Sequence, residues 1–384
     1  MVFIQRYLNL NTLLAKSSFF LFGPRLSGKS KLIATQLAHD AFVINLLKSS
    51  VFIELSAHPE RLEAMIKAQD KKLIVIDEVQ RLPWILNEVH WLIEEEGYRF
   101  LLTGSSGKKL KKSGTNLLAG RARVAHLFPL TYMELGERFD LMHYLNYGGL
   151  PKVYLSDEPV EELNTYLDIY LREEIQAEAF VRKLMSFLKF LEIAALTNGQ
   201  ILNFSNIASD IGLPVSSVRE YYLLLEDTFI GFLVPPFLGT SKRQALQSPK
   251  FYLFDLGVSH TLAGLTALDP KTERFGYAFE HFIALELRAY LHYKRLQSKL
   301  MHFRSRQGDE VDFIIGNQLA IEVKTSTQVK DKYLKGLQRF QEEQVVQQYI
   351  LVSLDPIDKK IGDISCMHWS SFLKKLWLDA FNIK

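Results

Sequence analysis

One loop constrains the fold of this chain more than any other feature of its sequence. Residues 17–40 read SSFFLFGPRLSGKSKLIATQLAHD, which is an apolar strand, a glycine-containing loop, and then apolar residues at helical spacing. The loop matches G-x-x-x-x-G-K-[ST], a pattern whose backbone N–H groups turn inward around a phosphate at the positive end of a helix. We expect these residues to bind the phosphates: Gly23, Pro24, Arg25, Leu26, Ser27, Gly28, Lys29, Ser30 and Lys31.

Two side chains of this loop have roles that follow from phosphate chemistry. The Lys29 ammonium group is placed to reach the β- and γ-phosphates, and the Ser30 hydroxyl is placed to ligate Mg²⁺. A chance glycine–lysine turn is the alternative, but the strand before it and the helix after it argue against that interpretation. The loop therefore predicts a nucleoside triphosphate and Mg²⁺ as ligands.

A second apolar run ends in two carboxylates. Residues 71–80 read KKLIVIDEVQ, and such a continuous apolar run is typical of a strand buried on both faces of a parallel sheet. We expect Asp77 to hold Mg²⁺ through water and Glu78 to act as the general base for the attacking water. An Asp-Glu pair alone is usually a solvated strand end, so its weight comes from the phosphate-binding loop that precedes it.

The rest of the N-terminal region supplies a sensor and an arginine. Residues 98–106, YRFLLTGSS, predict a third strand that ends in hydroxyl side chains, with Ser105 as the expected γ-phosphate sensor and Thr103 as the next choice. Arg121 and Arg123 come just before another strand, and Arg121 is our candidate for an arginine finger that reaches a neighbouring subunit. A surface arginine pair is the alternative. The alternation of strands and helices predicts a doubly wound α/β sheet with the nucleotide at the carboxyl ends of its strands.

The middle of the chain is predicted to be helical and then to form a winged helix. Apolar residues recur every three or four positions from residue 132 to residue 201. In FSNIASDIGLPVSSVREYYLLLEDTFI (204–230) a glycine-containing turn joins two short helices, and an apolar extended pair follows, as in a winged helix-turn-helix. The candidate DNA contacts are Ser216, Ser217 and Arg219 on the second helix, and Lys242 and Arg243 at a wing tip.

A helical packing module without DNA contact is the alternative for this segment. The second helix carries Glu220, Glu226 and Asp227 and few basic residues, whereas a helix that enters a phosphate-lined groove usually carries more. The net charge of +3 is also too small to indicate a nucleic-acid partner by itself.

The segment EVDFIIGNQLAIEVK (310–324) is a hairpin signal that contains charged residues. Two runs rich in Val, Ile and Phe flank a Gly-Asn turn. Because side chains alternate along a strand, Glu322 and Lys324 lie on one face, and Asp312 can meet them across the hairpin. With Glu280 from a preceding helix, these side chains suit a second divalent metal, Mg²⁺ or Mn²⁺, that would cleave a phosphodiester, with Lys324 activating water.

The alternative for this hairpin is an exposed ion pair on an edge strand. Asp312 argues against it because apolar residues lie on both sides of it, and a buried carboxylate without a metal or cation partner is costly. The order helix, three strands, helix, strand resembles the PD-(D/E)xK nuclease superfamily. The proline-aspartate pair of that name is absent, and Glu310-Val311-Asp312 stands in its place, which leaves cleavage open.

Motifs spread over nearly the whole length carry a further resemblance. FGPRLSGKS, LIVIDEVQRLP, RFLLTGSS, LLAGR, YGGLPKVYL, PKFYLFDLG and EVDFIIG…LAIEVKTS resemble those of prokaryotic AAA-type P-loop ATPases with a C-terminal domain of unknown function 4143. The resemblance implies ATP rather than GTP, an AAA-like core, a winged-helix segment and a restriction-endonuclease-like end.

These observations predict an α/β multidomain protein. Its parts are a doubly wound P-loop AAA-like ATPase core, a helical and winged-helix middle, and a C-terminal restriction-endonuclease-like α/β domain. The expected domain limits are 1–135 for the core, 136–200 for a helical connector, 201–249 for the winged helix and 250–384 for the nuclease-like domain.

The predicted function is a Mg²⁺-dependent ATPase that couples ATP binding and hydrolysis to DNA engagement, with metal-dependent DNA cleavage left open. The alternative is a nucleotide-gated switch for protein–protein interaction with an inactive nuclease fold. An arginine that acts in trans requires a homo-oligomer. The single cysteine, Cys366, excludes an intramolecular disulfide and a cysteine-based zinc site, and no apolar run is long enough to span a membrane, so a cytoplasmic location is expected.

Overall fold

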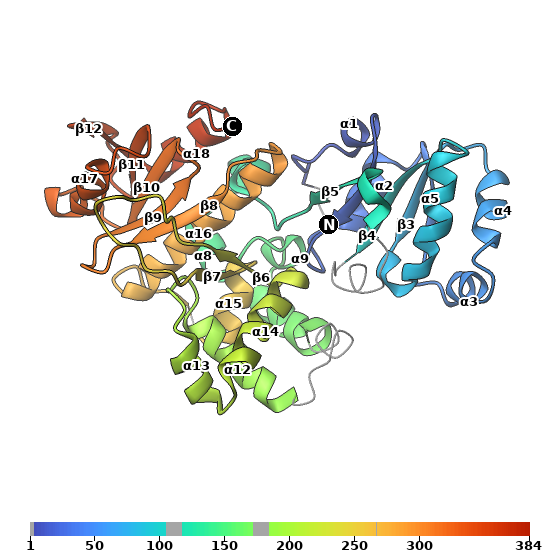
Figure 1. The fold of residues 1–384 in the computed structure, drawn as a ribbon, viewed down its shortest axis with the longest axis horizontal. Helices are drawn as coiled ribbons and strands as arrows, with labels where there is room; N and C mark the ends of the chain where they lie inside the picture. Colours follow the sequence, from blue (N-terminus) through green and yellow to red (C-terminus); the bar gives the residue numbers. More distant parts are fainter. Residues whose placement is uncertain (1–3, 105–116, 172–183, 266) are drawn as a thin grey trace.

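The computed structural model describes residues 4–104, 117–171, 184–265 and 267–384. Its N-terminal core is a five-stranded sheet in the order β2-β3-β4-β1-β5, and every neighbouring pair is parallel (Figure 1). The strands are β1 (Ser18–Phe22), β2 (Ala41–Asn45), β3 (Leu73–Asp77), β4 (Arg99–Gly104) and β5 (Ala122–His126). The helices of this core are α1 (Leu10–Leu14), α2 (Lys29–Gln36), α3 (Ser49–Ala57), α4 (Arg61–Lys67) and α5 (Leu86–Glu94).

The inner strand β1 has four successive apolar side chains after Ser18. Phe19 and Leu21 pack into one apolar cluster, and Phe20 and Phe22 pack into another on the opposite face of the sheet. A strand that is covered on both faces needs apolar side chains at odd and even positions alike. The predicted parallel α/β core is thus confirmed, with the loop after β1 at the carboxyl edge of the sheet.

The middle of the chain is mainly helical in its described part, as predicted. A glycine with left-handed backbone, Gly212, ends one helix of the expected pair, and two antiparallel strands follow the second helix. This element order agrees with the expected winged helix, but the winged helix itself and its contact with DNA both stay predictions. The elements are α7 (Tyr132–Leu135), α8 (Leu141–Tyr147), α9 (Pro151–Tyr154), α10 (Pro159–Thr165), α12 (Leu184–Leu196), α13 (Phe204–Ile211), α14 (Val215–Asp227), β6 (Gly231–Val234), β7 (Lys250–Leu253) and α15 (Leu256–Leu262).

Two of the quoted motifs, YGGLP and FDLG, meet in this middle part. The Asp255 carboxylate accepts hydrogen bonds from the backbone N–H groups of Gly149, at 2.8 Å, and Val258, at 3.1 Å. Gly148 has a φ of +76°, and a Cβ added there would lie 2.1 Å from the Asp255 carboxylate. The glycines therefore let the turn before α9 approach the first turn of α15.

The C-terminal domain is a six-stranded mixed sheet in the order β12-β13-β11-β10-β9-β8, with the long helix α16 beside it (Figure 1). The predicted order of helix, three strands, helix and strand is confirmed, as is the hairpin that joins β9 to β10. Its elements are α16 (Glu273–Tyr293), β8 (Leu300–Arg304), β9 (Glu310–Ile315), β10 (Leu319–Lys324), α17 (Lys335–Gln341), β11 (Gln348–Ser353), β12 (Lys359–Ile361), β13 (Ile364–His368) and α18 (Trp369–Trp377).

The segment between β6 and β7 differs from the expected wing. Arg243 forms ion pairs with Glu342, at 2.5 Å, and Glu343, at 3.2 Å, both just after α17. The backbone N–H of Leu246 donates to the carbonyl oxygen of Arg304 on the edge strand β8. In place of a basic wing tip, this segment covers the exposed edge of the C-terminal sheet, where unpaired backbone groups would otherwise remain. Within the described residues, no helix is long and apolar enough to cross a membrane.

Candidate functional site

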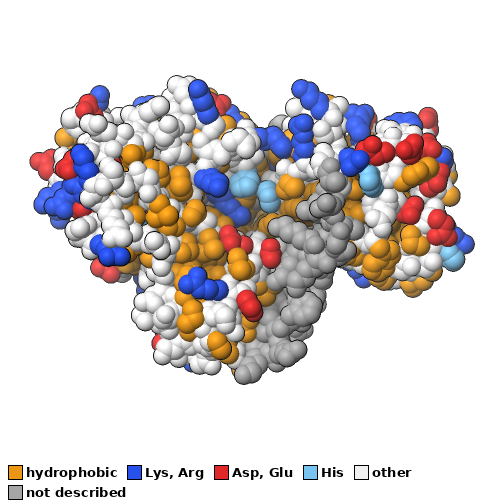
Figure 2. All heavy atoms as spheres, in the orientation of Figure 1, with side chains coloured by type: hydrophobic (Ala, Val, Ile, Leu, Met, Phe, Trp, Pro, Cys, Tyr) orange, Lys and Arg blue, Asp and Glu red, His pale blue; other side chains and the backbone are white. Residues whose placement is uncertain are grey.

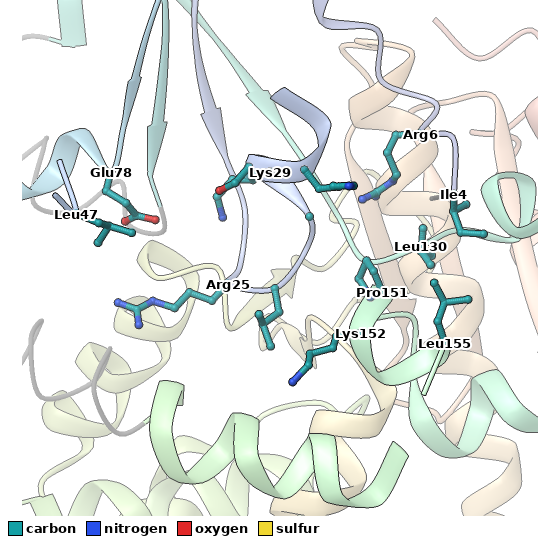
Figure 3. A pocket seen from close by; sticks show the side chains of 14 residues that line it. Ile4, Arg6, Arg25, Lys29, Leu47, Glu78, Leu130, Pro151, Lys152 and Leu155 are labelled. Atoms are coloured by element: carbon teal, nitrogen blue, oxygen red, sulfur yellow. The ribbon is translucent and has the colours of Figure 1, made fainter. Parts of the chain in front are cut away.

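A cavity of about 540 Å³ opens at the carboxyl edge of the N-terminal sheet (Figure 3). The loop after β1, the tip of β3, the N-terminal segment and the helix α9 all contribute to its wall. Ligand pockets in proteins usually have about 300–1,000 Å³, so the cavity has the size of a nucleotide site. Its lining residues are Ile4, Arg6, Arg25, Leu26, Gly28, Lys29, Ser30, Lys31, Leu47, Glu78, Leu130, Pro151, Lys152 and Leu155.

The phosphate-binding loop has the backbone that its sequence predicts. Gly28 lies immediately before α2 with a φ of +98°, and Leu26 also has a positive φ, of +59°. The Lys29 Nζ donates to the carbonyl oxygens of Gly23, at 2.6 Å, and Pro24, at 2.9 Å. Lys29 is thereby held across its own loop, on backbone acceptors that a phosphate oxygen is able to replace.

The hydroxyl group of Thr103 contacts both residues of the Asp-Glu pair at the end of β3. The Thr103 Oγ1 donates to Asp77 Oδ1 and accepts a hydrogen bond from the Glu78 backbone N–H, at 3.2 Å. Ser105, the preferred sensor, lies outside the described residues. Thr103, the next choice, is the strand-tip hydroxyl that contacts the acidic pair.

Glu78 has an unusual backbone for its residue type. Its φ is +61° and its ψ is +44°, in the left-handed region, where a residue other than glycine is held at a cost of about 1–2 kcal/mol. This turn aims its side chain into the cavity (Figure 3), where Gln80 Nε2 donates to Glu78 Oε2. Backbone strain concentrated at a cavity wall is typical of a residue held for function.

Arg6 is a pocket residue that the sequence analysis missed. Its guanidinium donates to the carbonyl oxygens of Ser27 and Phe128, each at 2.6 Å, and to Glu134, at 3.0 Å. It also donates to Tyr293 Oη on α16, at 3.3 Å. Arg6 thus joins the phosphate-binding loop to the helix that carries the C-terminal domain. An arginine in an ordinary N-terminal stretch gives no sequence signal of such a role.

The wall of the cavity opposite the loop is mostly apolar. Ile4, Leu130, Pro151 and Leu155 line it, and Lys152 lies at its edge (Figure 3). A largely apolar wall with few polar groups suits the planar base of a nucleotide. The middle of the chain therefore takes part in the pocket through α9.

Arg121 lies away from this cavity in its own chain. It precedes β5, and its guanidinium pairs with Glu94 on α5. Because β5 runs parallel to β1, with Ser18 beside Ala122, Arg121 is at the opposite end of the sheet from the phosphate-binding loop. Its action on a neighbouring subunit stays a prediction.

Two oxygen-bearing side chains that suit Mg²⁺ lie at this pocket, Ser30 in its lining and Asp77 next to the lining residue Glu78. Ser30 is the second residue of α2. Asp77, whose side chain is buried, is the last residue of β3, which lies two strands away from β1 in the sheet. Among the residues that the structure describes, no group of three or more His, Cys, Asp or Glu side chains is arranged to hold a metal ion. A Mg²⁺ ion bound with a nucleotide needs fewer protein ligands, because phosphate oxygens supply the others.

The residues of the second predicted site do come together in the C-terminal domain. Asp312 Oδ2 accepts a hydrogen bond from the Val323 backbone N–H, at 2.8 Å, and Lys324 Nζ lies 2.6 Å from Glu322 Oε1. Burial, then the charge of Asp312, raises the pKa of Glu322 to about 8, although Lys324 opposes that shift.

A lysine from another part of the chain lies among these carboxylates. Lys250, the first residue of β7, places its Nζ 2.9 Å from Glu280, 3.0 Å from Glu310 and 3.5 Å from Asp312. Tyr252 Oη donates to the same Glu280 oxygen, at 2.6 Å. Burial alone would lower the pKa of Lys250, but the nearby charges, led by Glu280, raise it well above its usual value.

Lys250 and Glu310 were not among the predicted site residues. The signal for Lys250 was present in the sequence, because it begins the otherwise apolar run KFYLFDLG and all four residues of β7 are buried. A lysine inside a buried strand needs carboxylate partners, and Glu280, Glu310 and Asp312 are those partners.

Three family models match successive parts of the chain. A model described as an AAA domain matches residues 15–136, and two described as domains of unknown function, 8612 and 4143, match residues 138–269 and 275–372. The AAA match, with the parallel sheet and its loop, supports a P-loop ATPase of the AAA type. The expected C-terminal domain 4143 is confirmed, whereas its nuclease-like nature stays a prediction.

Curated relatives resemble the chain over most of its length. An uncharacterised protein of Mycobacterium tuberculosis is 27% identical over 268 residues, which are 66% of this chain and 59% of that protein. The match thus spans less than two thirds of the mycobacterial relative. Uncharacterised proteins of Haemophilus influenzae and Methanocaldococcus jannaschii are 25% and 24% identical, with 72% and 77% of this chain and 74% and 71% of theirs covered.

One solved structure among the similar ones is the replication initiator DnaA bound to AMPPCP and single-stranded DNA. It is 14% identical and covers 58% of this chain and 90% of its own, with a TM-score of 0.29. A DNA replication initiation factor is 13% identical and covers 53% of this chain and 67% of its own, with a TM-score of 0.24. Scores this low carry no argument about fold or ligand.

Proposed function

We propose that the chain is a Mg²⁺-dependent ATPase. The observation that carries this proposal is a single cavity lined by both the phosphate-binding loop, with Lys29 and Ser30, and the Glu78 side chain. Binding and hydrolysis need these groups together, since one set holds the phosphates and the other orients water. The AAA domain match over residues 15–136 supports the same class of activity.

The roles of the protein's own groups follow from their positions. The Lys29 ammonium exchanges the carbonyl oxygens of Gly23 and Pro24 for β- and γ-phosphate oxygens. Ser30 and Asp77 would hold Mg²⁺, which supplies charge neutralisation at the phosphates when bound. Glu78, turned into the cavity and held by Gln80, accepts a proton from the attacking water.

DNA engagement is the second part of the proposal, and a basic surface supports it. Lys, Arg and His side chains gather where the C-terminal domain meets the ATPase core (Figure 2). Arg288, His292 and Lys299 line a hollow of about 370 Å³ there, together with Phe232. Basic groups next to aromatic faces suit a nucleic-acid strand, whose phosphates and bases need both kinds of contact.

Burial and neighbouring positive charges lower the pKa of basic groups on this surface, where Glu226 also lines the hollow and favours the charged form of Arg288. Burial, and then the nearby Arg288, lowers the pKa of His292 to about 4. Burial and the charge of Arg123 likewise lower the pKa of Arg295. A phosphate group would favour the charged forms of these basic groups, which supports nucleic-acid binding here.

The experiment that tests the proposal is phosphate release from ATP by the full chain with Mg²⁺, with and without single-stranded and duplex DNA. We expect hydrolysis in the wild type, a loss of about 100-fold or more in Lys29→Met, and faster hydrolysis with DNA. Hydrolysis that persists in Lys29→Met would rule out this pocket as the catalytic site.

The protein-switch alternative predicts a different outcome of the same assay. ATP hydrolysis would then depend on Lys29 but stay unchanged at every DNA concentration. Metal-dependent DNA cleavage is the third outcome to score, by incubating the same DNA with Mg²⁺ or Mn²⁺ and comparing the wild type with Asp312→Asn. The position of Lys250 among the carboxylates argues against cleavage by the resting protein.

A further inference from the structure

The carboxylate cluster of the C-terminal domain contains its own cation. Glu280 on α16 and Glu310 and Asp312 on β9 each lie within 3.5 Å of one ammonium group, that of Lys250. Only 2% of Lys250 is exposed, so its charge is satisfied by these groups and not by water. Buried carboxylates need a positive partner, and a lysine from another element supplies here the charge that a divalent cation supplies in an oxygen-ligand site.

We propose that the Lys250 ammonium group takes the place of a divalent metal in this cluster, so that the C-terminal domain is held metal-free and fastened to the middle of the chain. The inference goes beyond ATP hydrolysis and does not depend on it. It replaces the metal site that the hairpin sequence predicts with an internal ion cluster.

The charges around the cluster support this assignment. Lys324 pairs with Glu322 at 2.6 Å, and Arg304 lies 3.6 Å from Glu310. The cluster therefore contains three cationic side chains and four carboxylates, those of Glu280, Glu310, Asp312 and Glu322. A divalent ion added to this arrangement would bring excess positive charge into a buried site, and such charge is unfavourable without further ligands.

Lys250 and its carboxylate partners come from different parts of the chain, so the cluster also joins those parts. Lys250 belongs to β7, which pairs with β6 in the middle of the chain, whereas its carboxylate partners belong to α16 and β9. Backbone hydrogen bonds also join these two parts of the chain. The backbone N–H of His302 on β8 donates to the Pro235 carbonyl oxygen, and the backbone N–H of Phe237 donates to the His302 carbonyl oxygen. The cluster is thus the buried polar centre of an interface between the middle of the chain and the C-terminal domain.

Removal of the ammonium group should reveal the cation site. In Lys250→Met, the apolar side chain fills similar space but leaves Glu280, Glu310 and Asp312 without their central counter-ion. We expect Mn²⁺ to bind this variant at least about tenfold more tightly than it binds the wild type, because the freed carboxylates are oxygen ligands. The measurement is titration of nucleotide-free protein with Mn²⁺, followed by electron paramagnetic resonance of the free ion.

Two variants make the result specific to this cluster. Lys250→Arg keeps a positive charge and should bind no more Mn²⁺ than the wild type. Asp312→Asn in the Lys250→Met background should lose the added binding. As an independent readout, Mn²⁺ should raise the melting temperature of Lys250→Met but leave that of the wild type unchanged, because a ligand stabilises only the state that binds it.

The outcomes that would overturn the proposal are equally definite. Mn²⁺ binding by the wild type that disappears in Asp312→Asn would mean that Lys250 does not replace a metal. A folded Lys250→Met protein that binds no additional Mn²⁺ would mean that the cluster is not a cation site. If Lys250→Met does not fold, the wild type and Asp312→Asn decide: equal insensitivity to Mn²⁺ supports the proposal, and Asp312-dependent binding refutes it.

Discussion

Two buried lysines serve opposite purposes in this molecule. Lys29 is 7% exposed and donates to the backbone carbonyl oxygens of Gly23 and Pro24 at the wall of an open cavity. Lys250 is 2% exposed and lies among three carboxylates. The residue type and its burial are nearly the same, so the difference lies in the acceptors.

The acceptors decide whether a ligand is able to compete for the lysine. A carbonyl oxygen carries only a partial charge, so a phosphate that replaces it strengthens the interaction with the ammonium group. A carboxylate already carries a full charge, so an incoming anion gains little and must also displace a buried ion pair. Lys29 is therefore poised to bind a ligand, whereas Lys250 is arranged to hold the protein together.

The largest effect is expected at Glu78, the proposed general base of the ATPase. Glu78→Gln should reduce ATP hydrolysis by about 10²–10⁴-fold, because the amide no longer accepts the proton from water. Nucleotide affinity should stay close to that of the wild type, since the loop and Lys29 are untouched. Steady-state hydrolysis together with binding of a fluorescent ATP analogue measures both. Equal losses of affinity and rate would mean that Glu78 holds the nucleotide and does not act on water.

Changing each lysine to methionine tests whether its acceptors determine its contribution to stability. Lys250→Met should lower the free energy of unfolding by about 3–5 kcal/mol, because it leaves buried carboxylates uncompensated. Lys29→Met should lower it less, since the acceptors that it leaves behind are uncharged carbonyl oxygens and not carboxylates. Urea unfolding followed by circular dichroism provides the measurement.

A surface lysine supplies the control for this pair. Lys67 pairs with Glu63 and Glu96 in the solvent, where an ion pair contributes little, so Lys67→Met should leave the unfolding midpoint nearly unchanged. If Lys29→Met destabilises the protein as much as Lys250→Met does, the distinction between the two sets of acceptors is wrong.

Arg6 tests whether the pocket depends on the rest of the chain. Arg6→Met removes the donor to Ser27 and leaves Glu134, with 1% of its side chain exposed, without its guanidinium partner. We expect about 2–4 kcal/mol of lost stability and nucleotide binding weakened about tenfold. Arg61→Met, at an exposed pair with Glu54, is the matched control and should change neither quantity. Unchanged nucleotide affinity in Arg6→Met would confine its role to stability.

The residues of the proposed nucleotide pocket were predictable from the sequence, whereas the ion pairs of Lys250 were not. The phosphate-binding loop and Asp77-Glu78 are motifs of consecutive residues, and each follows a run of four apolar residues, so local pattern alone placed them at one edge of a sheet. The hairpin of residues 310–324 was equally local, because a Gly-Asn turn between apolar runs fixes the pairing.

The parts that the sequence did not reveal are contacts between distant residues. Arg6 meets Glu134 and Tyr293, and Lys250 meets Asp312, across separations that no periodicity describes. The interpretation of Lys242 and Arg243 as a wing tip shows the same limit, because their true partners, Glu342 and Glu343, lie a hundred residues away. A charged residue in an apolar stretch predicts that a partner exists but does not identify it.

The smallest effect is expected from a buried carboxylate, that of Glu286, which forms no ion pair with any residue that the structure describes. Glu286 accepts hydrogen bonds from the Tyr132 backbone N–H, at 2.7 Å, and from Trp377 Nε1, at 2.9 Å. Burial, only partly opposed by these donors, raises the pKa of Glu286 from 4.5 to about 7. The folded protein therefore binds a proton more tightly than the unfolded chain does, and this contribution is complete below pH 4.5 and lost as the pH rises through about 7.

We therefore expect the free energy of unfolding to fall by on the order of 2 kcal/mol between pH 5 and 8 because of this group. Urea unfolding at successive pH values measures the slope, and Glu286→Gln should flatten it around neutral pH while losing the Trp377 acceptor at every pH. Burial also raises the pKa of Glu322, to about 8, so Glu322→Gln is the companion variant, and it should flatten the slope at higher pH. If the free energy of unfolding of Glu286→Gln still falls with pH as it does in the wild type, another group causes the pH dependence. A slope that vanishes would show that the burial of Glu286, only partly offset by its two hydrogen-bond donors, makes the folded protein bind a proton near neutral pH.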